Sequence, residues 1–237
     1  MKIGILQCGH AAPEVIAEHG DYDSMFARLL AGHGFDFKTW NVVDMEFPPA
    51  PDAADGWLLS GSRHGVYEDH PFIPPLEDFI RAAHAARMPM VGVCFGHQII
   101  ARALGGQVGK FSGGWAIGRH VYDFDGLGKL AINAWHQDQV IEPPAGARTI
   151  ASSDFCRHAA LAYGDHILTV QPHPEFSSPL IGKYLHLRRG QPGFPDDVMD
   201  EAARHLGEPT DNARLGTEIA HFFLKHDRKH NDEAPNG

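Results

Sequence analysis

Apolar runs alternate with segments of helical spacing along the N-terminal part of the chain. Runs typical of buried strands lie at residues 2–7, 35–43, 56–60 and 90–93. Apolar positions at helical spacing lie at residues 22–32, 76–86 and 98–104, and glycines follow the first and last of these segments. Strands that alternate with helices predict a mostly parallel central sheet with helices on both faces.

The pattern changes at about residue 107, where short strands with Gly and Pro turns predict a small antiparallel insertion that continues to about residue 170. A buried strand is expected again at 167–171, and beyond Ser177 the chain is mainly helical, with amphipathic segments at 197–206 and 215–224. The expectation is an α/β fold with one domain over residues 1–180. A helical C-terminal extension packed on it is expected over 181–226, and a frayed tail over 227–237.

Composition narrows the class of protein without changing this fold. The chain has 237 residues, of which 43% are hydrophobic and 21% charged, and its formal net charge of −10 disfavours nonspecific binding to nucleic acid or to an anionic membrane surface. Membrane-spanning and signal-peptide patterns are absent from the sequence. The three cysteines are too few and too scattered for a disulfide framework, so we expect a cytoplasmic protein in which a free thiol stays usable.

The most informative segment has the form Gly-x-Cys-x-Gly, with Gly92, Cys94 and Gly96, between an apolar strand and a helix. Small residues at both glycine positions permit the sharp turn known from serine hydrolases. Such a turn places Cys94 at a helix N-terminus, which favours the thiolate, and directs the N–H of Phe95 toward the same space as an oxyanion donor. The alternative is that Cys94 is simply a small buried residue between two glycines.

A second motif follows the predicted strand at 167–171, where His173 stands between Pro172 and Pro174. The two prolines fix the local backbone, so the imidazole is held at the carboxyl end of a strand, where it can reach a neighbouring turn. Glu175 is close enough in sequence to hold the far imidazole nitrogen, as the third member of a catalytic triad does. The alternative is that one of 17 histidines happens to lie between prolines.

Together, the thiol turn and the His-Pro-Glu motif resemble the class I (triad) glutamine amidotransferase family. Within this family the chain is similar to stand-alone members that resemble the amidotransferase domain of GMP synthetase, over residues 1 to about 180. The resemblance implies a flavodoxin-like fold with Cys94 as nucleophile, His173 as base and Glu175 as the residue that orients the base. It also implies hydrolysis of glutamine, or of a γ-glutamyl compound, through a thioester.

The family's oxyanion loop is matched by the stretch 60–67, which begins Ser60-Gly61-Ser62. Ser62 replaces the family's second glycine, and Arg63 replaces its proline. The resemblance implies that the backbone N–H of Ser62 is the second oxyanion donor and that Gly61 lies at the substrate. An ordinary Gly/Ser turn is the alternative.

Three further residues are carried over as substrate-binding. Gln98, just after the thiol turn, corresponds to a family residue that holds the α-amino and carboxylate ends of glutamine. His136 and Asp138 lie in a segment that resembles another substrate-lining stretch, and the alternative for them is a polar loop at the edge of the inserted strands. The basic pair Arg188-Arg189 is interpreted as a solvated surface pair, because no glycine-rich loop precedes it.

The sequence predicts neither a metal nor a cofactor. His221 and His226 are five residues apart, which is not the one-turn spacing of helical zinc sites, and the sequence has no Walker-type phosphate loop. A glutaminase of this kind would pass ammonia to a separate ATP-using synthetase. A stand-alone γ-glutamyl peptidase is the alternative, and a non-catalytic interaction protein is a third possibility, against which the intact triad argues.

Overall fold

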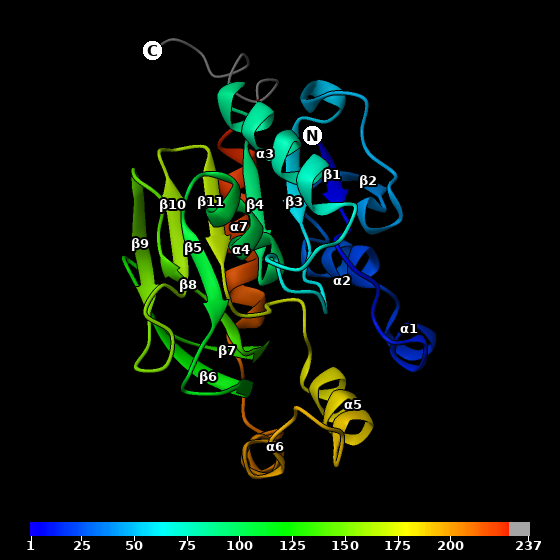
Figure 1. Ribbon diagram of the computed structural model, residues 1–237, viewed down its shortest axis with the longest axis vertical. Helices are drawn as coiled ribbons and strands as arrows, with labels where there is room; N and C mark the ends of the chain where they lie inside the picture. Colours follow the sequence, from blue (N-terminus) through cyan, green and yellow to red (C-terminus); the bar gives the residue numbers. More distant parts are fainter. Residues whose placement is uncertain (228–237) are drawn as a thin grey trace.

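The computed structural model describes residues 1–227, and its main element is a nine-stranded sheet in the order β2-β1-β3-β4-β11-β10-β9-β6-β7 (Figure 1). Its first five strands are parallel: β2 (Asp36–Trp40), β1 (Lys2–Leu6), β3 (Gly56–Leu59), β4 (Met90–Val93) and β11 (Ile167–Val170). The predicted α/β fold with a largely parallel core is therefore confirmed.

Antiparallel strands continue this sheet beyond β11. They are β10 (Ala160–Tyr163), β9 (Ala147–Ser152), β6 (Ala116–Phe124) and β7 (Gly128–His136). Only β5 (Gln107–Lys110) and β8 (Asp138–Glu142) form a separate two-stranded sheet within the described part of the chain. The predicted antiparallel insertion is present, and most of it extends the main sheet.

Helices cover both faces of the sheet. In Figure 1, α3 (Ile73–Ala85) and α4 (Phe95–Ala103) lie in front of it, while α7 (Asn212–Leu224) runs behind it. The remaining helices are α1 (Pro13–His19), α2 (Tyr22–Leu29), α5 (Ser178–Arg188) and α6 (Asp196–Arg204). Short 3-10 turns occur at Val42–Asp44 and Pro51–Ala53.

Alternation along the strands explains the two faces, because successive side chains of a strand point to opposite sides of the sheet. In β3, Leu58 packs into the core with α1, α2, α5 and α7, whereas Trp57 and Leu59 pack into the core with α3 and α4. All three side chains are fully buried. A parallel strand buried on both faces is expected to be continuously apolar, as this one is.

Several helix boundaries differ from the sequence-based expectation. Helix α3 begins at Ile73 because Pro74 and Pro75 fall in its first turn, where a proline needs no hydrogen-bond partner. Helix α4 begins at Phe95, directly after Cys94, and α1 was not predicted. The predicted domain boundary at residue 180 falls within α5, and the predicted frayed tail lies, apart from Asp227, outside the described residues. None of the helices in residues 1–227 is long and apolar enough to cross a membrane.

Candidate active site

Three loops meet at the carboxyl ends of neighbouring parallel strands. Strand β4 lies between β3 and β11, so the loops that follow these three strands are adjacent. The loops after β3, β4 and β11 carry Ser62, Cys94 and His173 respectively. The carboxyl edge of a parallel sheet is where α/β proteins usually bind their ligands, and residues far apart in sequence are brought together here.

Cys94 occupies a strained turn between β4 and α4. Its backbone has φ 53° and ψ −102°, which is unusual for a residue other than glycine. The turn is fixed by two backbone hydrogen bonds, from Cys94 N–H to the Val170 carbonyl (2.9 Å) and from Gly96 N–H to the Ser60 carbonyl (3.1 Å). The turn predicted from the sequence is therefore present.

The two glycines of the turn are required by close backbone contacts. A Cβ at Gly92 would stand 2.5 Å from the carbonyl oxygen of Gly96, and a Cβ at Gly96 would stand 2.3 Å from that of Leu59. Both distances are below any normal contact, so these positions accept no side chain without movement of the backbone. The glycine spacing thus holds Cys94 at the first turn of α4.

His173 and Glu175 form a buried pair beside this turn. Nδ1 of His173 lies 2.6 Å from Oε1 of Glu175, and both side chains are almost completely buried. Burial alone would lower the pKa of His173. The Glu175 carboxylate, the charge on Cys94 and a hydrogen bond with Cys94 outweigh this effect and raise the pKa to about 10. Because Nδ1 faces Glu175, the other ring nitrogen is left for the thiol, as in a hydrolytic triad.

The ring of His173 is also held by packing. It stacks on Phe176 with ring centroids 4.0 Å apart and an interplanar angle of 10°. Its backbone N–H donates to the carbonyl of Asn133 (2.8 Å), which ties the turn to β7. The imidazole is therefore fixed in orientation by Glu175, by Phe176 and by its own backbone.

The predicted oxyanion donors lie on the two adjoining loops. Within residues 1–227, neither the N–H of Phe95 nor that of Ser62 is paired with a protein acceptor. The Ser62 side chain faces its own loop, since its Oγ accepts from the N–H of His64 (3.2 Å). Both N–H groups therefore remain available for a ligand oxygen.

The predicted substrate-binding side chains form a connected group. The Gln98 amide nitrogen donates to the backbone carbonyl of Asp138 (2.9 Å) and to Oε1 of Gln171 (3.1 Å), which leaves the Gln98 side-chain oxygen to accept from a ligand. The Asp138 carboxylate accepts from the hydroxyl of Tyr67 (2.9 Å). Burial raises the pKa of Asp138, against the opposing effect of the Tyr67 hydrogen bond. Sequence reasoning did not single out Tyr67, although it lies in the segment matched to the oxyanion loop.

His136 is buried, and within the described residues neither ring nitrogen makes a hydrogen bond of normal geometry, while a weaker interaction with the backbone of Asp138 acts to raise its pKa. Burial, reinforced by the positive charge of His173, lowers the pKa of His136 to about 3, so the ring is neutral at physiological pH. A buried polar group without a partner is uncommon in proteins and calls for a ligand or a water molecule. His136 is thus suited to bind a polar substrate group without adding charge.

A cavity of about 890 Å³ connects these groups. Most of the predicted site residues line it: Ser62, Cys94, Gln98, His136, Asp138 and His173. The other three do not: Glu175 is buried beside His173, while Gly61 and Phe95 were predicted to act through their backbone or loop position. The two other cysteines, Cys8 and Cys156, are buried and do not line this cavity, and burial raises the pKa of each thiol to about 12.

The contacts of the predicted surface pair Arg188-Arg189 differ between its two members. Both side chains make solvent-exposed hydrogen bonds, but Arg188 also lines the cavity and lies over the Phe194 ring, whereas Arg189 pairs with Asp200. Helix α5 ends between the two residues, so consecutive arginines point in different directions, which composition and spacing do not reveal.

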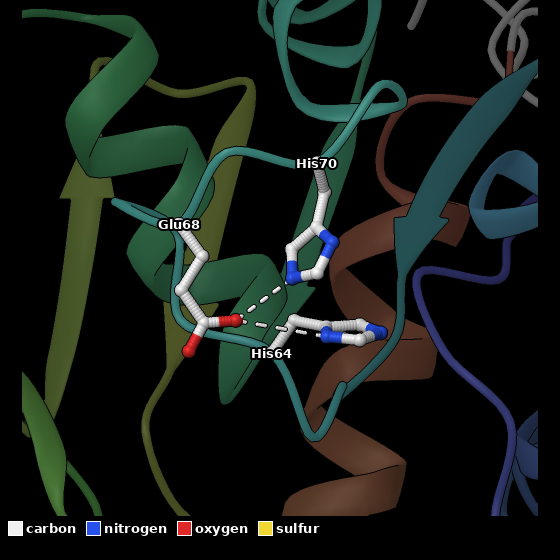
Figure 2. Close-up of side chains that lie close together, drawn as sticks. All are labelled: His64, Glu68 and His70. Atoms are coloured by element: carbon white, nitrogen blue, oxygen red, sulfur yellow. Dashed lines mark hydrogen bonds and ion pairs between the residues drawn. The ribbon is translucent and has the colours of Figure 1, made fainter.

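Within the described residues, one group of side chains has its potential metal-ligand atoms within 4.8 Å of one another: His64, Glu68 and His70. Figure 2 shows both imidazoles turned toward the same carboxylate oxygen, at 3.6 Å from Nδ1 of His64 and 2.8 Å from Nε2 of His70. The cluster lies on the loop that carries Ser62 and is partly exposed. Of these two contacts, the one from His70 is a hydrogen bond. The prediction that the chain needs no metal stays a prediction.

Comparisons with known proteins identify the family of the chain. A family model described as glutamine amidotransferase class-I matches residues 21–187, and the chain therefore belongs to that family, as the sequence motifs indicated. Gamma-glutamyl peptidase 2 of Arabidopsis thaliana is 30% identical over 90% of this chain and 91% of its own length. One subunit of the glutamine-hydrolysing GMP synthase of Saccharolobus solfataricus is 40% identical over 74% of this chain and 89% of its own length. A glutamine amidotransferase structure from Methylobacillus flagellatus shares the fold, with a TM-score of 0.72 at 20% identity over 95% of this chain and 94% of that one.

Proposed function

We propose that this chain hydrolyses the γ-amide of glutamine through a γ-glutamyl thioester on Cys94. The observation that carries the proposal is the His173–Glu175 contact of 2.6 Å beside the strained turn of Cys94. A nucleophile, a base within its reach and a buried group that orients the base are the parts that acyl transfer requires.

The proposed reaction has two halves. The Cys94 thiolate attacks the γ-carbonyl carbon, and the N–H groups of Phe95 and Ser62 stabilise the resulting oxyanion, each by about 3 kcal/mol. The His173 imidazolium gives its proton to the departing nitrogen as the C–N bond breaks and the thioester remains. The neutral imidazole then removes a proton from water, and the attack of that water releases glutamate and restores the thiolate.

The surroundings of the thiol are suited to this reaction. The buried Glu175 carboxylate stabilises the imidazolium form of His173, so that a proton is held ready for the leaving nitrogen at neutral pH. The neutral ring of His136 and the free oxygen of Gln98 offer hydrogen bonds to the substrate's amino and carboxylate ends. The backbone carbonyl of Asp138 accepts a hydrogen bond from Gln98, which holds the two residues side by side. The Asp138 carboxylate supplies the negative charge that an α-ammonium group prefers.

The proposed reaction releases ammonia, and the protein that consumes this ammonia would be the partner of the chain. The relative from Saccharolobus solfataricus is named as one subunit of a glutamine-hydrolysing synthase. By this likeness we propose that ammonia passes to a separate ATP-using synthetase. The cytoplasmic location expected from the sequence is consistent with a free catalytic thiol and such a partner.

A second candidate, a γ-glutamyl peptidase, is favoured by the size of the cavity. Its volume of about 890 Å³ lies toward the upper end of the range of about 300 to 1,000 Å³ that is usual for pockets that enclose drug-sized ligands, and far exceeds the needs of one amino acid. The Arabidopsis relative, which matches nearly the whole chain, carries the name of such a peptidase. The same thioester chemistry would then release an amine in place of ammonia.

The test measures glutamate release from free glutamine and from a γ-glutamyl dipeptide by the purified chain. Cys94→Ala should abolish release from both substrates, and Cys156→Ala, which removes a buried thiol outside the cavity, should retain it. Preference for glutamine would support the glutaminase, and preference for the dipeptide the peptidase. Release that survives Cys94→Ala would refute the mechanism, and failure of a glutamine-like electrophile to label Cys94 would favour a non-catalytic interaction protein.

A further inference from the structure

A row of aromatic rings begins at the proposed catalytic base. Phe176 stacks on His173, and the Tyr184 ring lies 5.6 Å from that of Phe176. The Trp135 ring lies 5.1 Å from that of Tyr184. All four side chains line the same cavity, so the row follows its wall from His173 onward.

The row continues into the segment between α5 and α6. The ring of Phe194 lies 6.0 Å from that of Trp135 and 4.8 Å from that of Trp115, and all three line the cavity. Trp115 and Phe194 are only partly buried, so their ring surfaces remain available. Aromatic faces exposed in a cavity favour apolar or aromatic ligands over water.

The positively charged side chain of Arg188 lies at the end of this row. The guanidinium carbon of Arg188 lies 5.6 Å from the centre of the Phe194 ring, and one of its nitrogens donates to the side-chain oxygen of Gln191 (3.0 Å). Within residues 1–227, Arg188 forms no ion pair, whereas its neighbour Arg189 pairs with Asp200. Arg188 is thus a cavity cation that lacks a counter-ion among the described residues, and a guanidinium is well suited to bind a carboxylate.

The position of His173 decides which part of a substrate meets this row. The base must be within reach of the nitrogen that leaves, so the group attached to that nitrogen begins beside His173. The next surface along the wall is the aromatic row. The γ-glutamyl end is instead served by the polar group of Gln98, Asp138 and His136.

We propose that the aromatic row with Arg188 is a subsite for the leaving group, which recognises an amine that carries an aromatic ring and a carboxylate, such as the phenylalanine part of γ-glutamyl-phenylalanine. The subsite rests on the proposed γ-glutamyl hydrolysis at Cys94. It adds a substrate class, γ-glutamyl conjugates of aromatic amino acids. In that reaction the proton from His173 goes to the α-amino nitrogen of the departing amino acid.

The test compares kcat/KM for γ-glutamyl-phenylalanine, γ-glutamyl-alanine and a γ-glutamyl anilide, which has the ring without the carboxylate. The phenylalanine compound should be preferred to the alanine compound by at least about tenfold, a usual contribution of apolar contacts to specificity. Phe194→Ala should remove most of that preference. Arg188→Gln should reduce kcat/KM about tenfold more for γ-glutamyl-phenylalanine than for the anilide, and Arg189→Gln, the matched surface control, should not.

Equal rates for the phenylalanine and alanine compounds, or a preference that Phe194→Ala leaves intact, would overturn the subsite while hydrolysis at Cys94 stands. Hydrolysis of glutamine alone would overturn it as well. Absence of any Cys94-dependent turnover, glutamine included, would instead be a failure of the proposed function. Circular dichroism of each variant separates loss of the subsite from loss of the fold, and the conservative Phe194→Leu should retain part of the preference.

Discussion

Gly61 lies directly against His173, so that a Cβ at Gly61 would stand 2.8 Å from Cε1 of the imidazole. The loop that carries Ser62 and the turn that carries His173, the proposed base, are therefore in contact through a position with no side chain. This explains why a glycine is needed before Ser62, since any larger residue would press on the imidazole of His173.

Gly61→Ala should accordingly lower kcat more than it raises KM, because the methyl group displaces the His173 ring from the thiol without touching the polar group that holds the γ-glutamyl end. A loss of about tenfold or more is expected, as small displacements of catalytic groups have large effects. Steady-state kinetics on the preferred substrate provides the measurement. Gly109→Ala is the matched control, because its Cβ would meet only Ile141, at 4.0 Å. Equal kinetics for the two variants would contradict the proposed contact.

The N–H of Ser62 can be separated from its side chain by two substitutions. Ser62→Ala keeps the N–H and should retain activity near that of the parent. Ser62→Pro removes the donor and should lower kcat by about 10²–10³-fold, the usual cost of one oxyanion donor. Circular dichroism of both variants should match the parent. If the alanine variant loses as much activity as the proline variant, the side chain and not the N–H is the functional group.

Glu175→Gln should move the alkaline limb of the pH profile of kcat/KM to lower pH. The glutamine can still accept a hydrogen bond but has no charge, so the pKa of His173 falls from about 10. The proton needed by the leaving nitrogen is then lost at a lower pH than in the parent. Profiles measured from about pH 6 to about pH 11 on both proteins would decide, and an unchanged alkaline limb would mean that Glu175 does not control the base.

Chelation should leave hydrolysis unchanged. The proposed chemistry uses a thiol and an imidazole, and none of its steps involves the cluster of His64, Glu68 and His70. Activity is measured after dialysis against EDTA and again after addition of Zn²⁺. A loss on dialysis that Zn²⁺ restores in the parent, but not in His70→Asn, would establish a functional metal at this loop and contradict the expectation.

Local chemistry explains why the strands and the thiol turn could be predicted from the sequence. A buried parallel strand is a short apolar run, and a turn as sharp as that at Cys94 admits only small residues at Gly92 and Gly96. Proximity of His173 to Cys94 followed from the rule that strand ends share one edge of a sheet. Each of these features is set by a few consecutive residues.

The features that could not be predicted from the sequence depend on contacts between distant segments. Nothing in the pair Arg188-Arg189 indicates that the end of α5 turns one side chain into the cavity and the other toward Asp200. Likewise, the His64, Glu68 and His70 cluster depends on how one loop folds back on itself, since sequence spacing alone fixes no distance between imidazoles. Strands β10, β9, β6 and β7 were expected to be antiparallel, but their addition to the main sheet depends on pairing across the chain.

The residues that line the cavity come from two parts of the chain, one within the family match and one beyond it. Cys94 and His173 are carried by the parallel strands, within the residues that the family model matches, whereas Arg188 and Phe194 lie beyond its end at residue 187. On the proposed function, changes after α5 would alter the Arg188 and Phe194 end of the leaving-group subsite and would leave Cys94 and His173 untouched. Relatives with the same reaction centre need not act on the same compounds.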